Sequence, residues 1–163
     1  MQTIAEAKQY LKDNYVEGVR CPCCDQLVKK YSRKITSTMA RSLISLYHES
    51  TSTYSPIHIT NIKFVQGGEF AQMRRWGLIA EAKNETTTKR TSGLWYITQK
   101  GKDFVNGRIQ VPMYCDTYNG KTLGFSRETT TIKQALGNKF DYMELMGRPT
   151  IPDQEAKKAI SWL

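Results

Sequence analysis

The sequence predicts a mixed α+β fold, and residues 69–104 carry most of the evidence. Phe70, Met73 and Trp76 recur at helical spacing in this stretch. Gly77 follows them and supplies the left-handed residue that commonly ends a helix. Two strand-like segments around a polar loop come next, and a further helix completes the stretch. Helices and strands in this order favour an α+β architecture.

The two strands and the polar loop follow the first helix directly. Residues 78–79 begin the first strand, and residues 94–97 form the second, with large side chains on both faces. Residues 84–93 are too polar to bury and too long for a tight hairpin, so we expect them to project into solvent. Thr98 can cap the next helix because its hydroxyl can accept a first-turn N–H. This order is that of the back half of a winged helix.

Two segments carry a family resemblance. Residues 73–79 (MRRWGLI), the basic loop and residues 95–101 (WYITQKG) resemble the helix, wing and capped-helix signature of MarR-like winged helix-turn-helix domains. The resemblance covers residues 36–107, and it implies that residues 69–76 are the recognition helix. With a Cys-Pro-x-Cys knuckle in front and a Tyr-rich hairpin behind, the chain also resembles small winged-helix proteins encoded by bacteriophages.

The chain is therefore expected to be a winged-helix core with added elements at both ends. The expected segments are an N-terminal helix, cysteine knuckle and basic strand (1–35), the winged-helix domain (36–107), a Tyr-rich β-hairpin with short helices (108–147), and a linker with a C-terminal helix (148–163). A length of 163 residues suits one domain of ordinary size or one small domain with such additions.

The N-terminal segment begins with a helix signal. Thr3 and Glu6 have the spacing of a capping box, which predicts a helix over residues 3–14. Residues 27–35 then suggest a strand with Val28, Tyr31 and Ile35 directed inward.

Cys21 and Cys24 form a Cys-Pro-x-Cys half-motif that resembles half of a zinc-ribbon knuckle. A structural zinc needs four ligands, and only Cys115, His48 and His58 remain to complete a site with them. Two interpretations stay open: one structural zinc with its remaining ligands unknown, or a metal-free knuckle held by packing and the Pro22 turn. A disulfide is disfavoured in a reducing compartment.

The formal charge of +9 leaves a positive field that attracts polyanions. Four cations crowd into the basic strand, and they are either a solvated face or a stripe that contacts phosphates. They are Lys29, Lys30, Arg33 and Lys34.

The winged-helix segment opens with a helix that Thr36 or Ser37 can cap. Met39, Leu43, Leu46 and Tyr47 recur along it at helical steps. Residues 57–59 then suit a short strand that pairs with the wing strands, and Thr60 is expected to cap a short helix over residues 61–65.

On the helix at residues 69–76, the polar side chains fall outside the predicted core face. Gln and Arg can make bidentate contacts to adenine and guanine edges, and Arg also contacts phosphates. Solvated cations that complement the helix dipole are the competing interpretation. The candidate DNA contacts are Gln72, Arg74 and Arg75 on the helix, Lys83, Lys89 and Arg90 in the wing, and the four cations of the basic strand.

A hairpin is expected after the winged helix, since Asn119-Gly120 is a strong turn signal between residues 109–118 and 123–125. It could cover the knuckle, extend the sheet of the winged helix or present aromatic side chains to a partner. Thr131 can cap a short helix, and residues 140–146 form another helical turn. Residues 153–163 suggest an amphipathic helix that folds back or joins two chains as a homodimer.

Catalysis has little support in the sequence. The two histidines lack a neighbouring nucleophile motif, no Gly-rich phosphate loop is present, and the carboxylates are scattered. No apolar stretch approaches the ~20 residues that span a membrane, and the N-terminus lacks the pattern of a signal peptide. We therefore expect a non-enzymatic, cytoplasmic protein, in the host cytoplasm if a phage encodes it.

The expected function is binding of double-stranded DNA as a transcription regulator or accessory factor in phage or mobile-element biology. The alternative is a winged helix that binds or inhibits a host protein through the aromatic hairpin and the C-terminal helix. A third option is binding of RNA or single strands by the basic strand, with Tyr31 stacking on a base.

Overall fold

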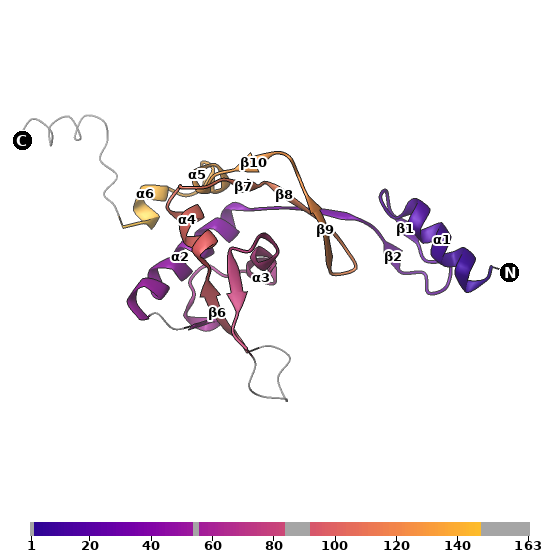
Figure 1. Cartoon of the computed structure of the whole chain (residues 1–163), viewed down its shortest axis with the longest axis horizontal. Coiled ribbons are helices and arrows are strands. Elements are labelled where there is room, and N and C mark those ends of the chain that lie inside the picture. Colours follow the sequence, from indigo (N-terminus) through magenta and orange to yellow (C-terminus); the bar gives the residue numbers. More distant parts are fainter. Residues whose placement is uncertain (1, 54–55, 84–91, 148–163) are drawn as a thin grey trace, which may run out of the picture. The chain divides into compact units, whose positions relative to one another are not determined.

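The structure is a computed structural model, and it describes residues 2–53, 56–83 and 92–147. The chain is a mixed α+β protein with small antiparallel sheets, as the sequence predicted. It divides into two compact units (Figure 1). The first unit comprises Met1–Lys34 and Pro112–Thr129, and the second comprises Ile35–Val111 and Thr130–Leu163. Residues 112–129 thus join the N-terminal segment, which the expected four-part division did not foresee.

The first unit contains one helix, a two-stranded hairpin and a three-stranded sheet. Its elements are α1 (Ile4–Asn14), β1 (Val19–Arg20), β2 (Leu27–Val28), β3 (Tyr31–Lys34), β8 (Tyr114–Tyr118) and β9 (Lys121–Phe125). Helix α1 starts where the sequence predicted, because Thr3 and Glu6 form the capping box.

The three-stranded sheet of the first unit joins segments that are far apart in the sequence. Strand β3 pairs antiparallel with β8, which places Tyr31 opposite Thr117, and β8 pairs with β9. Asn119 and Gly120 take positive φ values of 49° and 76° at the turn, as expected for a tight hairpin. Among the described residues, the hairpin forms a separate sheet with β3 and does not extend the sheet of the predicted winged-helix segment.

Tyr31 does not point inward as predicted. All four residues of β3 are exposed, and the Tyr31 side chain is 48% exposed. Ile35, by contrast, is buried. The prediction treated residues 27–35 as one strand, whereas β2 and β3 are separate strands in different sheets, so one alternation does not run through both.

The second unit contains most of the helices around a small sheet. Its elements are α2 (Ser37–Thr53), β4 (Ile57–His58), the 3₁₀ helix η1 (Ile59–Asn61), α3 (Glu69–Gln72), the 3₁₀ helix η2 (Met73–Trp76), β5 (Ile79–Glu81), β6 (Leu94–Ile97), α4 (Gln99–Val105), α5 (Ile132–Leu136) and α6 (Tyr142–Leu145). The antiparallel sheet has the order β4-β6-β5. Strands β7 (Val111–Pro112) and β10 (Thr129–Thr130) form a separate two-stranded sheet.

Helix α2 lies at the centre of the second unit, against α3, α4, α5 and β6 (Figure 1). Its Leu43 and Leu46 are buried, as the helical spacing predicted. Thr36 caps it, since the hydroxyl accepts the N–H of Met39 at 3.1 Å. Phe70 of α3 packs edge-on against Trp95 of β6, with 5.4 Å between ring centres.

The expected short helix over residues 61–65 is absent from this part of the structure. The turn begins two residues earlier, because the His58 side chain accepts the N–H of Thr60 at 3.2 Å and caps η1. Phe64 has a φ of 68°, which is incompatible with a right-handed helix. The prediction of a Thr60 cap was therefore wrong, and the chain turns at His58 instead.

The remaining local signals are confirmed. Gly77 ends η2 with a φ of 73°, and Thr98 caps α4 by accepting the N–H of Gly101 at 3.0 Å. Thr131 forms a second capping box at the start of α5, and α6 lies within residues 140–146. The predicted helix at residues 153–163 lies outside the described residues, and so does the loop at residues 84–91.

Candidate nucleic-acid interface

The helix of residues 69–76 is short, since it consists of one α-helical turn continued by a 3₁₀ turn. Phe70, Met73 and Trp76 are buried, so the predicted core face is confirmed. On the other side, Arg75 Nε donates to Gln72 Oε1 at 2.6 Å. This bond holds the amide and the guanidinium together, so the two candidate DNA contacts are oriented before any ligand arrives.

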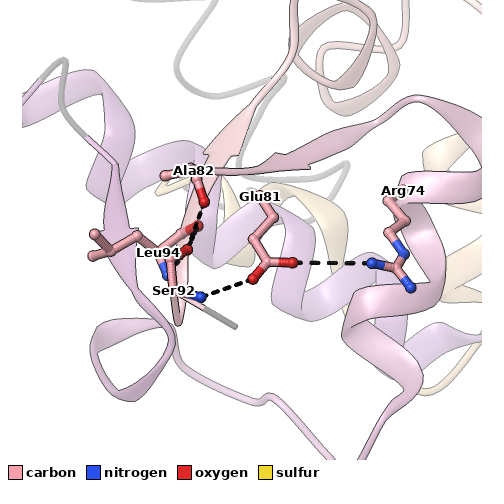
Figure 2. A network of polar contacts seen from close by, with 5 residues as sticks. All are labelled: Arg74, Glu81, Ala82, Ser92 and Leu94. Carbon is pink, nitrogen blue, oxygen red and sulfur yellow. Dashed lines mark hydrogen bonds and ion pairs between the residues drawn. The ribbon is translucent and has the colours of Figure 1, made fainter. Parts of the chain in front are cut away.

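Arg74 is connected to the two strands that follow the helix (Figure 2). Its Nη1 lies 3.9 Å from Glu81 Oε2, at the end of β5, and its side chain is 57% exposed. The other oxygen of Glu81 accepts the N–H of Ser92 at 3.0 Å. One carboxylate therefore joins the helix to the residue that leads into β6.

Ser92 fastens the ends of β5 and β6 together (Figure 2). Its hydroxyl donates to the carbonyl of Ala82 at 2.7 Å and accepts the N–H of Leu94 at 3.2 Å. These hydrogen bonds hold together the ends of β5 and β6, the two strands that flank the polar segment. Lys83 is exposed directly after Ala82, whereas Lys89 and Arg90 lie outside the described residues.

The four cations of the basic strand differ in their positions: Arg33 and Lys34 lie on β3 of the first unit's sheet, whereas Lys29 and Lys30 lie in the link between β2 and β3. Lys30 Nζ lies 3.6 Å from Asp116 Oδ2 in an ion pair. Arg33 Nε donates to the neutral hydroxyl of Thr117 at 3.3 Å. Lys29 and Lys34 are exposed. Asp116 thus offsets the charge of Lys30, while the contact between Arg33 and Thr117 leaves the charge of Arg33 in place.

The cysteine knuckle is the turn between β1 and β2. Asp25 donates its N–H to the carbonyl of Cys21, and Cys21 donates its own N–H to Gln26. The Cys21 sulfur accepts the N–H of Cys23 at 3.4 Å. Backbone N–H groups of Cys23 and then Cys24 lower the pKa of the Cys21 thiol, because they favour the thiolate.

The described residues contain no group of three or more His, Cys, Asp or Glu side chains that could hold a metal ion. Cys115 is fully buried in β8, and the two histidines belong to the second unit. Zinc at Cys21 and Cys24 therefore stays a prediction without identified further ligands.

The first unit contains a hollow of about 390 Å³ that the sequence did not reveal. Residues of the knuckle, of the basic strand and of the hairpin line it, among them Cys21, Cys24, Lys29, Tyr31, Arg33 and Thr117. The pairing of β3 with β8 brings these residues together. Tyr31 and its partner Thr117 are 86 positions apart in the sequence, so no local pattern could indicate that they meet.

The second unit has a smaller hollow of about 180 Å³ beside α2. The Arg41 guanidinium lies 3.4 Å from the Phe64 ring centre and 4.4 Å from that of Phe140. His48, on α2 like Arg41, forms a hydrogen bond of 2.7 Å between its Nε2 and the carbonyl of Leu145 in α6. Arg41 stands between two aromatic rings and so contributes to packing, a role that the sequence did not indicate.

The candidate residues thus fall into two sets, one in each unit. Gln72, Arg74 and Arg75 gather on the helix of the second unit, with Lys83 exposed at the end of the neighbouring strand. The cations of the basic strand lie in the first unit, Arg33 and Lys34 on β3 and Lys29 and Lys30 just before it. Each set is therefore supported by the secondary-structure elements of its own unit.

Comparison with protein-family models, with curated proteins and with solved structures found no match to this chain. Within the part of the chain that the structure describes, no helix combines the length and the apolar character needed to cross a membrane.

Proposed function

We propose that the second unit is a winged-helix domain of MarR-like type that binds double-stranded DNA. The order of elements supports this proposal: α2, β4, the helix at residues 69–76, β5, a basic loop and β6. The helix at residues 69–76 would enter the major groove, and the loop would follow the flanking backbone. The protein would then act as a regulator or accessory factor in phage or mobile-element biology.

The connection from Arg74 through Glu81 to Ser92 carries the proposal (Figure 2). Duplex binding by two separate elements needs both in a fixed geometry, because misplaced contacts lose binding energy to conformational entropy. Glu81 contacts both the exposed Arg74 and Ser92, at the end of the loop, and so fixes their positions relative to each other. A short helix can then serve as a reading element since its position is set by the sheet.

The Glu81 carboxylate also weakens the binding of phosphate by Arg74. Glu81 attracts Arg74, so a phosphate must compete with it for the guanidinium. Arg75 is hydrogen-bonded to the neutral amide of Gln72. We therefore assign to Arg74 a phosphate contact that Glu81 weakens, and to Arg75 a contact made together with Gln72.

The test is fluorescence anisotropy with a labelled mixed-sequence duplex over a range of salt concentrations. The Arg74→Ala, Arg75→Ala double variant should weaken binding at least about tenfold and reduce the salt slope by about 1 to 2, as expected for lost phosphate contacts. Glu81→Gln keeps an acceptor for Ser92 but removes the competing charge, so it should tighten binding.

The matched control is Arg108→Ala. Arg108 is also an exposed arginine of the second unit, 68% exposed, with its Nη1 3.5 Å from Asp103 Oδ1. Its removal should change duplex affinity less than about twofold if the helix is the interface. Equal losses in Arg108→Ala and in the double variant, or duplex binding without salt dependence, would contradict the proposal.

Strand β9 favours a second candidate function, capture of a host protein. Leu123 and Phe125 are 48% and 44% exposed on this strand. Exposed apolar side chains on a strand suit a protein interface. Retention of a host protein at high salt, lost in Leu123→Asp and unaffected by the arginine variants, would favour this function over DNA binding.

A further inference from the structure

A second surface with the chemistry of a nucleic-acid site lies in the first unit. Tyr31 and Arg33 lie two positions apart on β3, Lys29 lies in the link just before this strand, and all three line the 390 Å³ hollow. An exposed aromatic ring therefore stands between two cations along the chain, and all three side chains border one hollow. The hollow lies within the ~300–1,000 Å³ range typical of ligand sites.

The walls of the hollow are held in place by contacts within the first unit. The rings of Tyr15 and Tyr118 lie 4.8 Å apart, and Lys30 donates its backbone N–H to the carbonyl of Tyr15 at 2.8 Å. These contacts fasten the end of α1 to the hairpin and to the basic strand. The hollow is thus a feature of packed elements rather than of one loose segment.

Both cations of the hollow are also positioned. The aliphatic stem of Lys29 lies against Gly18, where a Cβ would come within 3.4 Å of it, and Gly18 has a φ of 101° that favours glycine. Arg33 is oriented by its bond to the Thr117 hydroxyl. These contacts restrict both side chains without neutralising them.

The charge on this face is not offset by its lining. Among the described residues around the hollow, the charged side chains are Lys29 and Arg33. Asp116 and Lys30 are paired with each other, and neither lines the hollow. A ligand that enters the hollow therefore meets two cations and an exposed ring.

We propose that this hollow binds single-stranded nucleic acid, with one unpaired base stacked on Tyr31 and phosphates held by Lys29 and Arg33. Lys29 and Arg33 are four positions apart in the chain, and Tyr31 lies midway between them. A planar base flanked by two phosphates matches that order of groups. A duplex does not, because its bases are already stacked and paired.

The proposal does not depend on the function proposed for the second unit. Duplex binding there relies on the arginines of the helix, and single-strand binding here relies on Tyr31. The two activities should respond to different variants, so failure of one leaves the other testable.

Fluorescence anisotropy with labelled oligo(dT) and oligo(U) of equal length tests the site, and a duplex serves as the third probe. Tyr31→Ala should weaken single-strand binding about 5- to 150-fold, the range expected for one lost base–aromatic stack. Tyr31→Phe keeps the ring and should bind within about twofold of the unchanged protein. Binding of one oligonucleotide or of both identifies DNA, RNA or either as the ligand.

The matched control is Tyr96→Ala. Tyr96 is 43% exposed on β6 of the second unit, and like Tyr31 it stands on a strand. Its removal should leave single-strand affinity unchanged. Lys29→Gln and Arg33→Gln should each reduce the salt slope, whereas Lys121→Gln, at an exposed lysine of the same unit outside the hollow, should not.

Three results would overturn the proposal: no binding of either oligonucleotide, equal binding by Tyr31→Ala and the unchanged protein, or equal losses in Tyr31→Ala and Tyr96→Ala. Circular dichroism of Tyr31→Phe and Tyr31→Ala separates lost stacking from lost folding. If Tyr31→Ala fails to fold, the Tyr31→Leu variant replaces it, because leucine keeps bulk without an aromatic face.

Discussion

The two units of this protein are stabilised by different means. The second unit buries large apolar side chains such as Leu43, Trp76 and Phe104 in a shared core. Among the described residues of the first unit, the buried apolar side chains are Ala7 and Cys115. Its elements are joined by strand pairing, by the Lys30–Asp116 ion pair and by the Tyr15–Tyr118 contact.

This difference extends to the two basic surfaces. A packed core can fix a short helix in one position, and the arginines on it are further held by neighbouring side chains. A sheet with little core beneath it instead exposes a tyrosine and two cations on its strand β3. Surfaces of the second kind are often stabilised by the ligand that they bind. The following predictions test the contrast, from the largest expected effect to the smallest.

Trp76→Ala should cost the second unit about 3–5 kcal/mol of unfolding free energy, because it removes a fully packed aromatic side chain. Urea denaturation followed by fluorescence of the remaining tryptophans measures the change, since Trp95 also belongs to the second unit. Tyr96→Ala, at an exposed site of the same sheet, should cost less than about 1 kcal/mol. Similar losses of unfolding free energy in both variants would contradict the view that the buried core stabilises this unit.

Gly101→Ala should cost about 2 kcal/mol or more, because a Cβ at this position of α4 would collide with the Leu78 carbonyl and the Ile97 side chain. The glycine of the family-like motif is thus explained by the close approach of α4 to the sheet. Gly68→Ala is the control, since a Cβ there meets nothing within 4 Å. It should change the unfolding free energy by less than about 1 kcal/mol in the same urea experiment.

Asp116→Asn should cost the first unit no more than about 1 kcal/mol, because both partners of the ion pair with Lys30 are about one-third exposed. Amide hydrogen exchange in β3 and β8 measures the effect without interference from the second unit. A loss comparable to that of Trp76→Ala would mean that electrostatics, rather than strand pairing, holds this sheet together.

The smallest expected effect concerns Cys21 alone and leaves stability unchanged. N–H donors from the knuckle favour its thiolate, so its pKa lies below that of an ordinary thiol. As pH rises, alkylation of Cys21 by iodoacetamide should therefore begin at a lower pH in the folded protein than in urea. Peptide mass spectrometry measures this order, with Cys23 as the internal reference. The same onset in both states would contradict the structure of the knuckle.

How far the sequence predicted the candidate sites differs between the units. Helical periodicity alone put Arg74 and Arg75 outside the core, and the structure agrees. Their partner Glu81 and the link to Ser92 were not foreseen, because these contacts join separate elements. In the first unit the cations were identified, but Tyr31 was expected to point inward, and the hollow depends on a strand from the other end of the chain.

The sequence by itself determined the local features of this protein. Helix caps at Thr3, Thr98 and Thr131, the stop at Gly77 and the Asn119-Gly120 turn all rest on hydrogen bonds or backbone angles within about four residues. Only the tertiary structure decided that β3 pairs with β8. Pairing of distant strands depends on competition among all exposed strand edges, which no local pattern encodes. For that reason the helix surface was predictable, whereas the hollow beside the basic strand was not.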